Sequence, residues 1–128
     1  MIAGAYKKAG FDEVVLTSAS DDKGRDVIAI KRDFVTVRVL DQVKAYKRGH
    51  LVDANDVRAL LGVLSGDHNA SKGVVTTTSD FAPKIVDDPF IKPFIPYRLE
   101  LVNGGELIRR LSRLVEQDQR SAYCQTTD

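Results

Sequence analysis

The chain has 128 residues, of which 43% are hydrophobic and 29% are charged, and its formal net charge is +1. These values are typical of one globular domain with a continuous core, and they exclude a protein whose whole surface is strongly basic. Cys124 is the only cysteine, so an internal disulfide is excluded and a zinc site is disfavoured. No apolar run approaches the roughly 18 residues of a membrane span, so we expect a cytoplasmic protein with no membrane partner.

The first part of the chain alternates between short apolar segments and polar turns. A helix is predicted over 2–9, and it ends at Gly10 because glycine commonly follows the last helical residue. Runs of β-branched and apolar residues then predict three strands, over 13–17, 26–31 and 34–44. The short link at Arg32 and Asp33 favours an antiparallel hairpin between the second and third of these strands.

The second part of the chain mixes helical and strand-like patterns. Apolar residues at helical spacing follow Asp53 and Asn55, and either side chain is suited to cap the helix that they predict. The remaining elements are a buried strand, an irregular stretch, a last strand, an amphipathic helix and a polar tail, over 73–79, 80–96, 97–102, 106–117 and 118–128. The irregular stretch contains all four prolines of the chain, which are not tolerated inside one regular element.

The resulting order of elements is α-β-β-β-α-β-irregular-β-α. A meander of three strands, followed by strands that helices separate, is typical of α/β proteins with a mixed sheet. We therefore expect a mixed β-sheet of about five strands flanked by helices, in one domain over 1–117 with a tail over 118–128.

Three polar residues stand at one end of the predicted hairpin. Asp26 opens the second strand, and Gln42 and Lys44 end the third. Side chains two residues apart share one face of a strand, so Gln42 and Lys44 point the same way. If the hairpin turns tightly, facing residue numbers sum to about 65 or 66, which places Asp26 opposite residue 39 or 40. A carboxylate, an amide oxygen and an ammonium group can bind a hard cation and face an attacking water or a phosphate.

The chain resembles the catalytic domain of Mrr-type restriction endonucleases, which belong to the PD-(D/E)XK nuclease superfamily, in the variant where the D/E is Gln. The resemblance covers residues 2–115 and includes the segments GRDVIAI, LDQVKAYK, DVRALLGVL, NASKGVVTTTSDFAP and YRLELVNGGELIRRL. A D…QxK pattern alone occurs by chance in many chains. Its place on neighbouring strands, with the other segments following in order, makes the resemblance specific.

The resemblance implies a restriction-endonuclease-like fold and a metal-dependent endodeoxyribonuclease that uses Mg²⁺ or Mn²⁺ against foreign or modified double-stranded DNA. It implies that Asp26 and Gln42 are catalytic metal ligands, and that catalytic Lys44 orients or activates the attacking water. The backbone carbonyl of Val43 is implied to complete the metal shell. Candidate DNA contacts beside this site are Arg25, Lys47, Arg48, His50, Lys72 and Ser79.

The family also carries a Glu on its first helix. Counting back from Gly10 places that position just before residue 1, so we expect the first helix to be truncated at its N-terminus. Asp12, Glu13 and Asp22 are the nearby acids that could replace this Glu. Asp41 is not one of them, because it points to the strand face opposite the site.

The sequence leaves two other functions open. A chain without the first-helix Glu fits a catalytically impaired DNA-binding or assembly module on a nuclease scaffold. A structure-specific nuclease of recombination or repair, such as a junction resolvase, would use a similar site. Resolvases act as symmetric dimers, so a homodimer also stays open as the oligomeric state.

Overall fold

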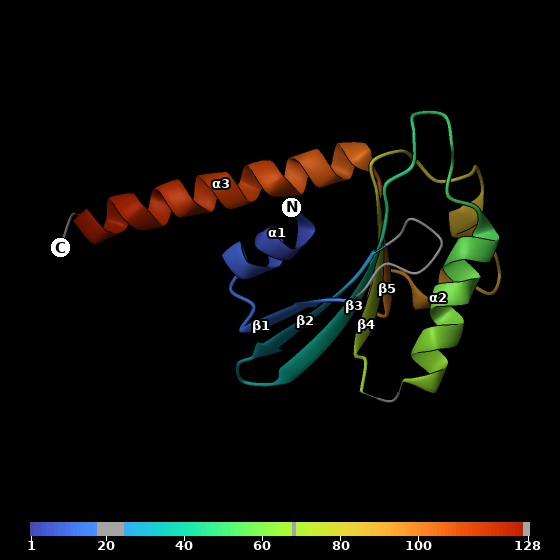
Figure 1. Cartoon of the computed structure of the whole chain (residues 1–128), viewed down its shortest axis with the longest axis horizontal. Coiled ribbons are helices and arrows are strands. Elements are labelled where there is room, and N and C mark those ends of the chain that lie inside the picture. The colour runs from blue at the N-terminus through green and yellow to red at the C-terminus, as the bar shows by residue number, and fades with distance from the viewer. Residues whose placement is uncertain (18–24, 68, 127–128) are drawn as a thin grey trace.

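One five-stranded sheet with helices on both faces forms the body of the protein (Figure 1). The computed structural model describes residues 1–17, 25–67 and 69–126. Its elements are α1 (Ile2–Lys8), β1 (Glu13–Leu16), β2 (Arg25–Arg32), β3 (Thr36–Lys44), α2 (Ala54–Gly66), β4 (Lys72–Thr77), the 3-10 helices η1 (Ile85–Asp87) and η2 (Lys92–Phe94), β5 (Leu99–Val102) and α3 (Gly104–Thr126). This order confirms the predicted α/β class. In the described part of the chain, no helix is long and apolar enough to cross a membrane.

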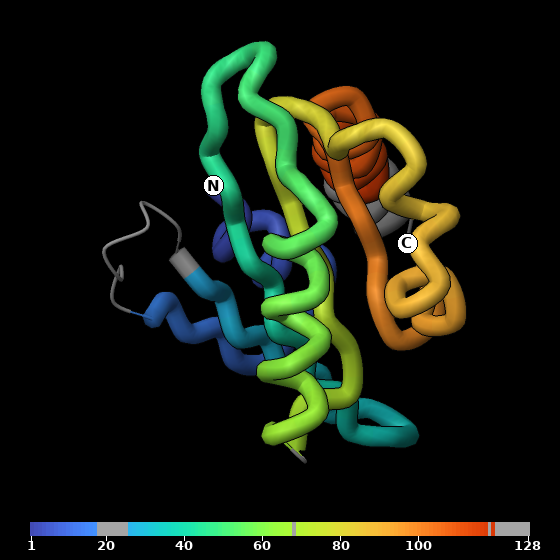
Figure 2. The backbone as a smooth tube through the Cα atoms, turned by 90° about the vertical axis from the view of Figure 1, so that its right-hand side faces the viewer, coloured from blue at the N-terminus to red at the C-terminus, as the bar shows by residue number. Residues whose placement is uncertain are grey.

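The strands lie in the order β1-β2-β3-β4-β5. Pairing is antiparallel from β1 to β3 and parallel from β3 to β5, so the sheet is mixed, as predicted. Figure 2 shows the segment over 80–98 beside β5, at the sheet edge away from β1. This arrangement places the last residues of β3, β4 and β5 at one end of the sheet. The first residues of β2 lie at the same end.

Each face of the sheet carries its own apolar core. The larger core packs under α2 and includes Leu40, Val75 and Leu99. The smaller core packs under α1 and α3 and includes Val39 and Val74 (Figure 1). Neighbouring residues of one strand alternate between the two cores, which explains why the central strands read as nearly continuous apolar runs.

Helix α2 begins at the first of its two predicted caps. The Asp53 carboxylate accepts a hydrogen bond from the backbone N of Asp56 at 2.9 Å, and the Asp56 carboxylate accepts one from the backbone N of Asp53 at 3.3 Å. This reciprocal pair satisfies two helix-terminal N–H groups. Val57, Leu60 and Leu64 then face the sheet and are buried.

The hairpin between β2 and β3 has a wider turn than predicted. Its loop comprises residues 33–35, because Arg32 pairs with Thr36 across the two strands. The backbone N of Phe34 donates to the Asp33 carboxylate at 2.9 Å, and the backbone N of Asp33 donates to the carbonyl of Val35 at 3.2 Å. These local bonds close a three-residue loop, and facing residue numbers therefore sum to 68 rather than to 65 or 66.

Helix α3 starts earlier and ends later than predicted. It runs over Gly104–Thr126 instead of 106–117. The Asn103 side chain accepts a hydrogen bond from the backbone N of Glu106 at 2.9 Å, which caps the helix and lets it begin two residues earlier. Glu106 also forms ion pairs with arginines one and two turns further on, at positions 109, 110 and 113. A boundary between a domain over 1–117 and a tail over 118–128 stays a prediction.

Gly104 marks a close approach between α3 and the segment after β4. A Cβ atom at Gly104 would lie 2.6 Å from the backbone oxygen of Thr78. We expect Gly104→Ala to lower the free energy of unfolding by about 1–3 kcal/mol, because the obstacle is backbone and must shift. Gly105→Ala is the matched control, since its Cβ would meet nothing closer than 3.7 Å. Urea unfolding measures both variants, and equal stability of the two would contradict the prediction.

Candidate active site

The hairpin brings Asp26 and Gln42 directly opposite each other. Antiparallel partners point to the same face of a sheet, and Lys44 shares that face because it lies two residues further along β3. Ile28 and Leu40, the next facing pair on this side, contact the core under α2. The site therefore lies on the sheet face that α2 covers, at the end of the sheet where β3 stops. The wider hairpin turn brings the trio closer together than the predicted register would.

Asp26, Gln42 and Lys44 are all half-buried. Burial raises the pKa of the Asp26 carboxyl above its ordinary value, and the positive charge of Lys44 acts in the opposite direction. Electrostatic interactions are stronger in such a partly desolvated position than in bulk water. The three groups can therefore act on a charged ligand more strongly than they would on an open surface.

The end of β1 holds the backbone of Asp26. The backbone N of Thr17 donates to the Asp26 carbonyl at 3.0 Å, and the Thr17 hydroxyl donates to the same oxygen at 3.2 Å. The backbone N of Asp26 in turn donates to the Thr17 hydroxyl oxygen at 3.3 Å. Sequence reasoning missed this contact, because pairing between β1 and β2 does not follow from the spacing along the chain.

The oxygen atoms at the site fit a hard divalent cation. Asp26 offers a carboxylate, Gln42 offers a neutral amide oxygen, and Val43, between Gln42 and Lys44 in the chain, has a backbone carbonyl. Within the described residues, no three His, Cys, Asp or Glu side chains gather as a ready-made metal site. A donor set with one carboxylate suits Mg²⁺, which commonly keeps several water molecules and also binds phosphate oxygens of a substrate.

The acids expected as replacements for the first-helix Glu do not reach Asp26. Asp12 accepts a hydrogen bond from the backbone N of Arg32 at 2.5 Å, at the other end of β2. Glu13 faces Ile30 in the sheet and forms an ion pair with Arg32 at 2.9 Å. Asp22 lies outside the described residues.

A basic loop follows β3 directly after the candidate site. Lys47, Arg48 and His50 are exposed on this loop, which Figure 1 shows between β3 and α2. The backbone N of His50 donates to the carbonyl of Lys47 at 2.9 Å, and its ring stacks on Tyr46 with centroids 4.1 Å apart. The loop thus presents its cations from a folded turn.

The remaining predicted DNA contacts differ in position. Ser79 follows β4 at the same end of the sheet as the site, and it lines a cavity of about 730 Å³ together with Arg48. Lys72 lies at the opposite end of β4, where it faces Val39 of β3 and forms an ion pair with Glu100 at 2.5 Å. The structure does not bring Lys72 to the site. The side chain of Arg25 lies outside what the structure describes.

Thr77 is a neighbour of the site that the sequence pattern did not single out. It faces Lys44 across the parallel pair of β3 and β4, and its side chain is fully buried. Its hydroxyl oxygen accepts a hydrogen bond from the backbone N of Ser79 at 3.1 Å. Threonines at 76–78 are ordinary strand residues in the sequence, and only the parallel register places one of them beside Lys44.

The chain is similar to known restriction endonucleases in sequence pattern and in fold. A family model described as restriction endonuclease, the Mrr catalytic domain, matches residues 1–111. The fold is similar to that of the DNA modification-dependent restriction endonuclease AspBHI, with a TM-score of 0.62 and 20% identity over 86% of this chain and 29% of that one. It is also similar to MspJI restriction endonuclease in complex with a 27-mer oligonucleotide, with a TM-score of 0.56 and 22% identity over 89% of this chain and 26% of that one. The chain thus spans less than a third of either enzyme. No curated protein sequence matches it.

Proposed function

Because the chain belongs to the Mrr family of restriction endonuclease catalytic domains, we propose that it is a Mg²⁺-dependent endonuclease domain acting on double-stranded DNA. The observation that carries the proposal is the direct pairing of Asp26 with Gln42, with Lys44 on the same face. One similar enzyme is named as DNA modification-dependent, and the other was solved with an oligonucleotide. We accordingly propose restriction of foreign or modified DNA in the cytoplasm as the biological role.

The residues of the trio divide two tasks in the proposed reaction. Asp26, Gln42 and the carbonyl of Val43 would hold the cation at the end of β3. Bound Mg²⁺, or Mn²⁺ in its place, supplies positive charge that stabilises the transition state of phosphodiester hydrolysis. Lys44 donates a hydrogen bond that orients the attacking water, and its charge offsets the negative charge developing on the phosphate.

The basic loop after β3 is proposed to bind the DNA backbone. Lys47 and Arg48 are exposed and lie a few residues beyond Lys44. Contacts to phosphates position a duplex without reading its sequence, and they weaken as salt concentration rises. His50 and Ser79 lie at the same end of the sheet, and we propose them as further contacts to the DNA backbone.

Supercoiled plasmid provides the direct test of the proposed activity. We expect the chain to convert it to nicked or linear DNA in Mg²⁺ or Mn²⁺ and to leave it intact in excess EDTA. Gel electrophoresis over a time course measures the products. Salt-dependent binding of DNA without cleavage in either ion would contradict the proposal and favour a non-catalytic DNA-binding module.

Gln42→Glu tests the proposed metal shell. A Glu at this position adds a second carboxylate opposite Asp26, so we expect the Mg²⁺ concentration for half-maximal cleavage to fall roughly tenfold. Gln42→Ala removes the amide oxygen and should raise that concentration. Cleavage rates across a Mg²⁺ titration measure both effects, and an unchanged half-maximal concentration in both variants would exclude Gln42 from the shell.

A further inference from the structure

Asp41 is a buried carboxylate on the strand that carries the candidate site, and the proposed reaction does not use it. Its side chain is only 2% exposed and points to the sheet face under α1 and α3. The neighbouring positions on this face of β3 are Val39 and Val43, so an acid interrupts an apolar row. Burying a carboxylate is unfavourable unless hydrogen bonds compensate for the lost water.

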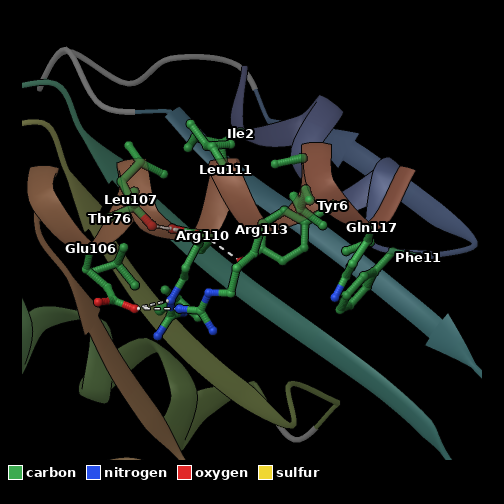
Figure 3. Close-up of a pocket in the computed structure, with 16 residues that line it drawn as sticks. Ile2, Tyr6, Phe11, Thr76, Glu106, Leu107, Arg110, Leu111, Arg113 and Gln117 are labelled. Atoms are coloured by element: carbon green, nitrogen blue, oxygen red, sulfur yellow. Dashed lines mark hydrogen bonds and ion pairs between the residues drawn. The ribbon is translucent and has the colours of Figure 1, made fainter. Parts of the chain in front are cut away.

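Two hydroxyl groups from other elements compensate for the burial of Asp41. The Tyr6 hydroxyl of α1 donates to Asp41 Oδ2 at 2.6 Å. The Thr76 hydroxyl of β4 lies 2.8 Å from Oδ1 and 3.0 Å from Oδ2. Figure 3 shows Tyr6 and Thr76 among the residues that line the cavity between α1, α3 and the sheet. We call these three residues the Asp41 clamp, since they join α1, β3 and β4.

The surroundings of Asp41 and Tyr6 act on the pKa values of both side chains. Burial raises the pKa of Asp41 to about 6, while the hydrogen bonds from Tyr6 and Thr76 and the charge of Arg110 act to lower it. Burial and the neighbouring Asp41 raise the pKa of the Tyr6 hydroxyl, which therefore stays protonated and remains a donor. The clamp thus consists of one acid side chain that accepts hydrogen bonds from two hydroxyl groups.

The clamp lies directly behind the candidate metal ligands. Asp41 immediately precedes Gln42 in β3, and its two neighbours on that strand point to the opposite face. Thr76 faces Val43, whose carbonyl is a proposed ligand, across the pairing of β3 and β4. Thr76 therefore bonds to Asp41, the residue before Gln42, and pairs with Val43, the residue after it.

We propose that Asp41 is a positioning residue, which holds residues 42–44 of β3 in place through its bonds to Tyr6 and Thr76. The inference rests on the proposed function, because holding these residues in place affects a reaction only if Gln42 binds a metal and Lys44 acts on a phosphate. Apolar residues in place of all three clamp residues would avoid the burial of a charge, and such complete replacements of buried polar groups are often neutral or stabilising. The acid thus serves geometry more than stability. A displacement of about 1 Å at a catalytic group lowers rates by roughly a hundredfold.

Thr76 provides the sharpest test, because two substitutions separate its hydroxyl from its shape. Thr76→Val keeps the shape and removes the hydrogen bond, whereas Thr76→Ser keeps the hydroxyl. We expect Thr76→Val to lower the single-turnover cleavage rate by roughly 10- to 100-fold and the serine variant to stay near the wild type. KM for DNA should not change in either variant, because the clamp lies on the sheet face opposite the site. Tyr6→Phe should give an intermediate loss of rate.

Binding of Mn²⁺ to the protein–DNA complex, followed by electron paramagnetic resonance, gives a readout besides cleavage. We expect Thr76→Val to weaken Mn²⁺ binding several-fold and Thr76→Ser to leave it unchanged. Leu107→Ala, in the same core under α3, controls for lost stability, and it should lower the unfolding midpoint without changing Mn²⁺ binding. Wild-type rate and Mn²⁺ affinity in Thr76→Val would overturn the positioning role.

Substitutions of Asp41 itself distinguish its hydrogen bonds from its charge. Asp41→Asn keeps an acceptor for Tyr6 and can donate to Thr76, so we expect it to retain most of the activity. Asp41→Val should be impaired like Thr76→Val. Equal impairment of the Asn and Val variants would overturn the inference in favour of a purely electrostatic role. If the Val variant does not fold, the pair at position 76 still decides. A wild-type chain that neither cleaves DNA nor binds Mn²⁺ would instead remove the proposed function, and the positioning role with it.

Discussion

Asp26→Asn is expected to lower the rate of plasmid cleavage by roughly a thousandfold or more, at saturating DNA and at the Mg²⁺ concentration that saturates the wild type. Asp26 is the one carboxylate among the proposed ligands, and Asn preserves its size while removing its charge. The remaining oxygens of Gln42 and Val43 are neutral, so the site would hold a divalent cation weakly. Single-turnover cleavage across a Mg²⁺ titration measures the loss, and high Mg²⁺ should restore only part of it.

The stability of this variant separates lost chemistry from lost structure. The pKa of Asp26 is raised in the folded protein, so the ionised form is disfavoured there at pH values above its ordinary pKa. Removing that charge should therefore leave the free energy of unfolding at pH 7 unchanged or higher. Asp87→Asn, at an exposed position of η1, is the matched control and should cleave like the wild type. Cleavage by Asp26→Asn at the control rate would exclude Asp26 from the site.

The order of the elements could be predicted because each is encoded locally. Alternating and helical apolar patterns, with Gly10 and Asp53 at helix ends, predict the sequence of helices and strands that the structure contains. The register of the hairpin could not be predicted, because it depends on the bonds inside the loop over 33–35. The observed sum of 68 differs from 66 by an even number, so a register with the sum of 66 already places Asp26 on the face of Gln42 and Lys44, whereas one with the sum of 65 places it on the opposite face.

The contents of the site were harder to predict than its location. The trio lies on two strands that follow each other in the sequence. Thr17 and Thr77 lie beside the trio only because β1 pairs with β2 and β4 pairs with β3. Lys72 is a predicted DNA contact, but it is the first residue of β4, and a parallel strand begins at the end of the sheet far from where β3 ends. Asp41 was correctly placed on the opposite face. Its partners Tyr6 and Thr76 lie 35 residues away in either direction, and no local pattern connects them.

Lys44 and Lys47 differ in ways that predict different roles for two lysines of one segment. Lys44 ends β3 on the site face and is half-buried, and its charge acts on Asp26. Lys47 is exposed on the loop that follows. A half-buried cation at a reacting phosphate stabilises the transition state, whereas an exposed cation contributes mainly to salt-dependent binding. The two charges should therefore separate cleavage from binding.

Lys44→Ala is accordingly expected to lower the cleavage rate at saturating DNA by roughly 10²- to 10³-fold, because a donor aimed at the developing charge is lost. Its affinity for DNA in EDTA should change little. Lys47→Ala should show the reverse pattern, with a near-normal rate at saturation and a slope of log affinity against log salt that is smaller by about one. Single-turnover cleavage and fluorescence anisotropy at several salt concentrations measure both variants. If Lys44→Ala weakens binding and leaves the saturated rate intact, Lys44 is one more contact to the DNA backbone, and the attacking water must be oriented by another group.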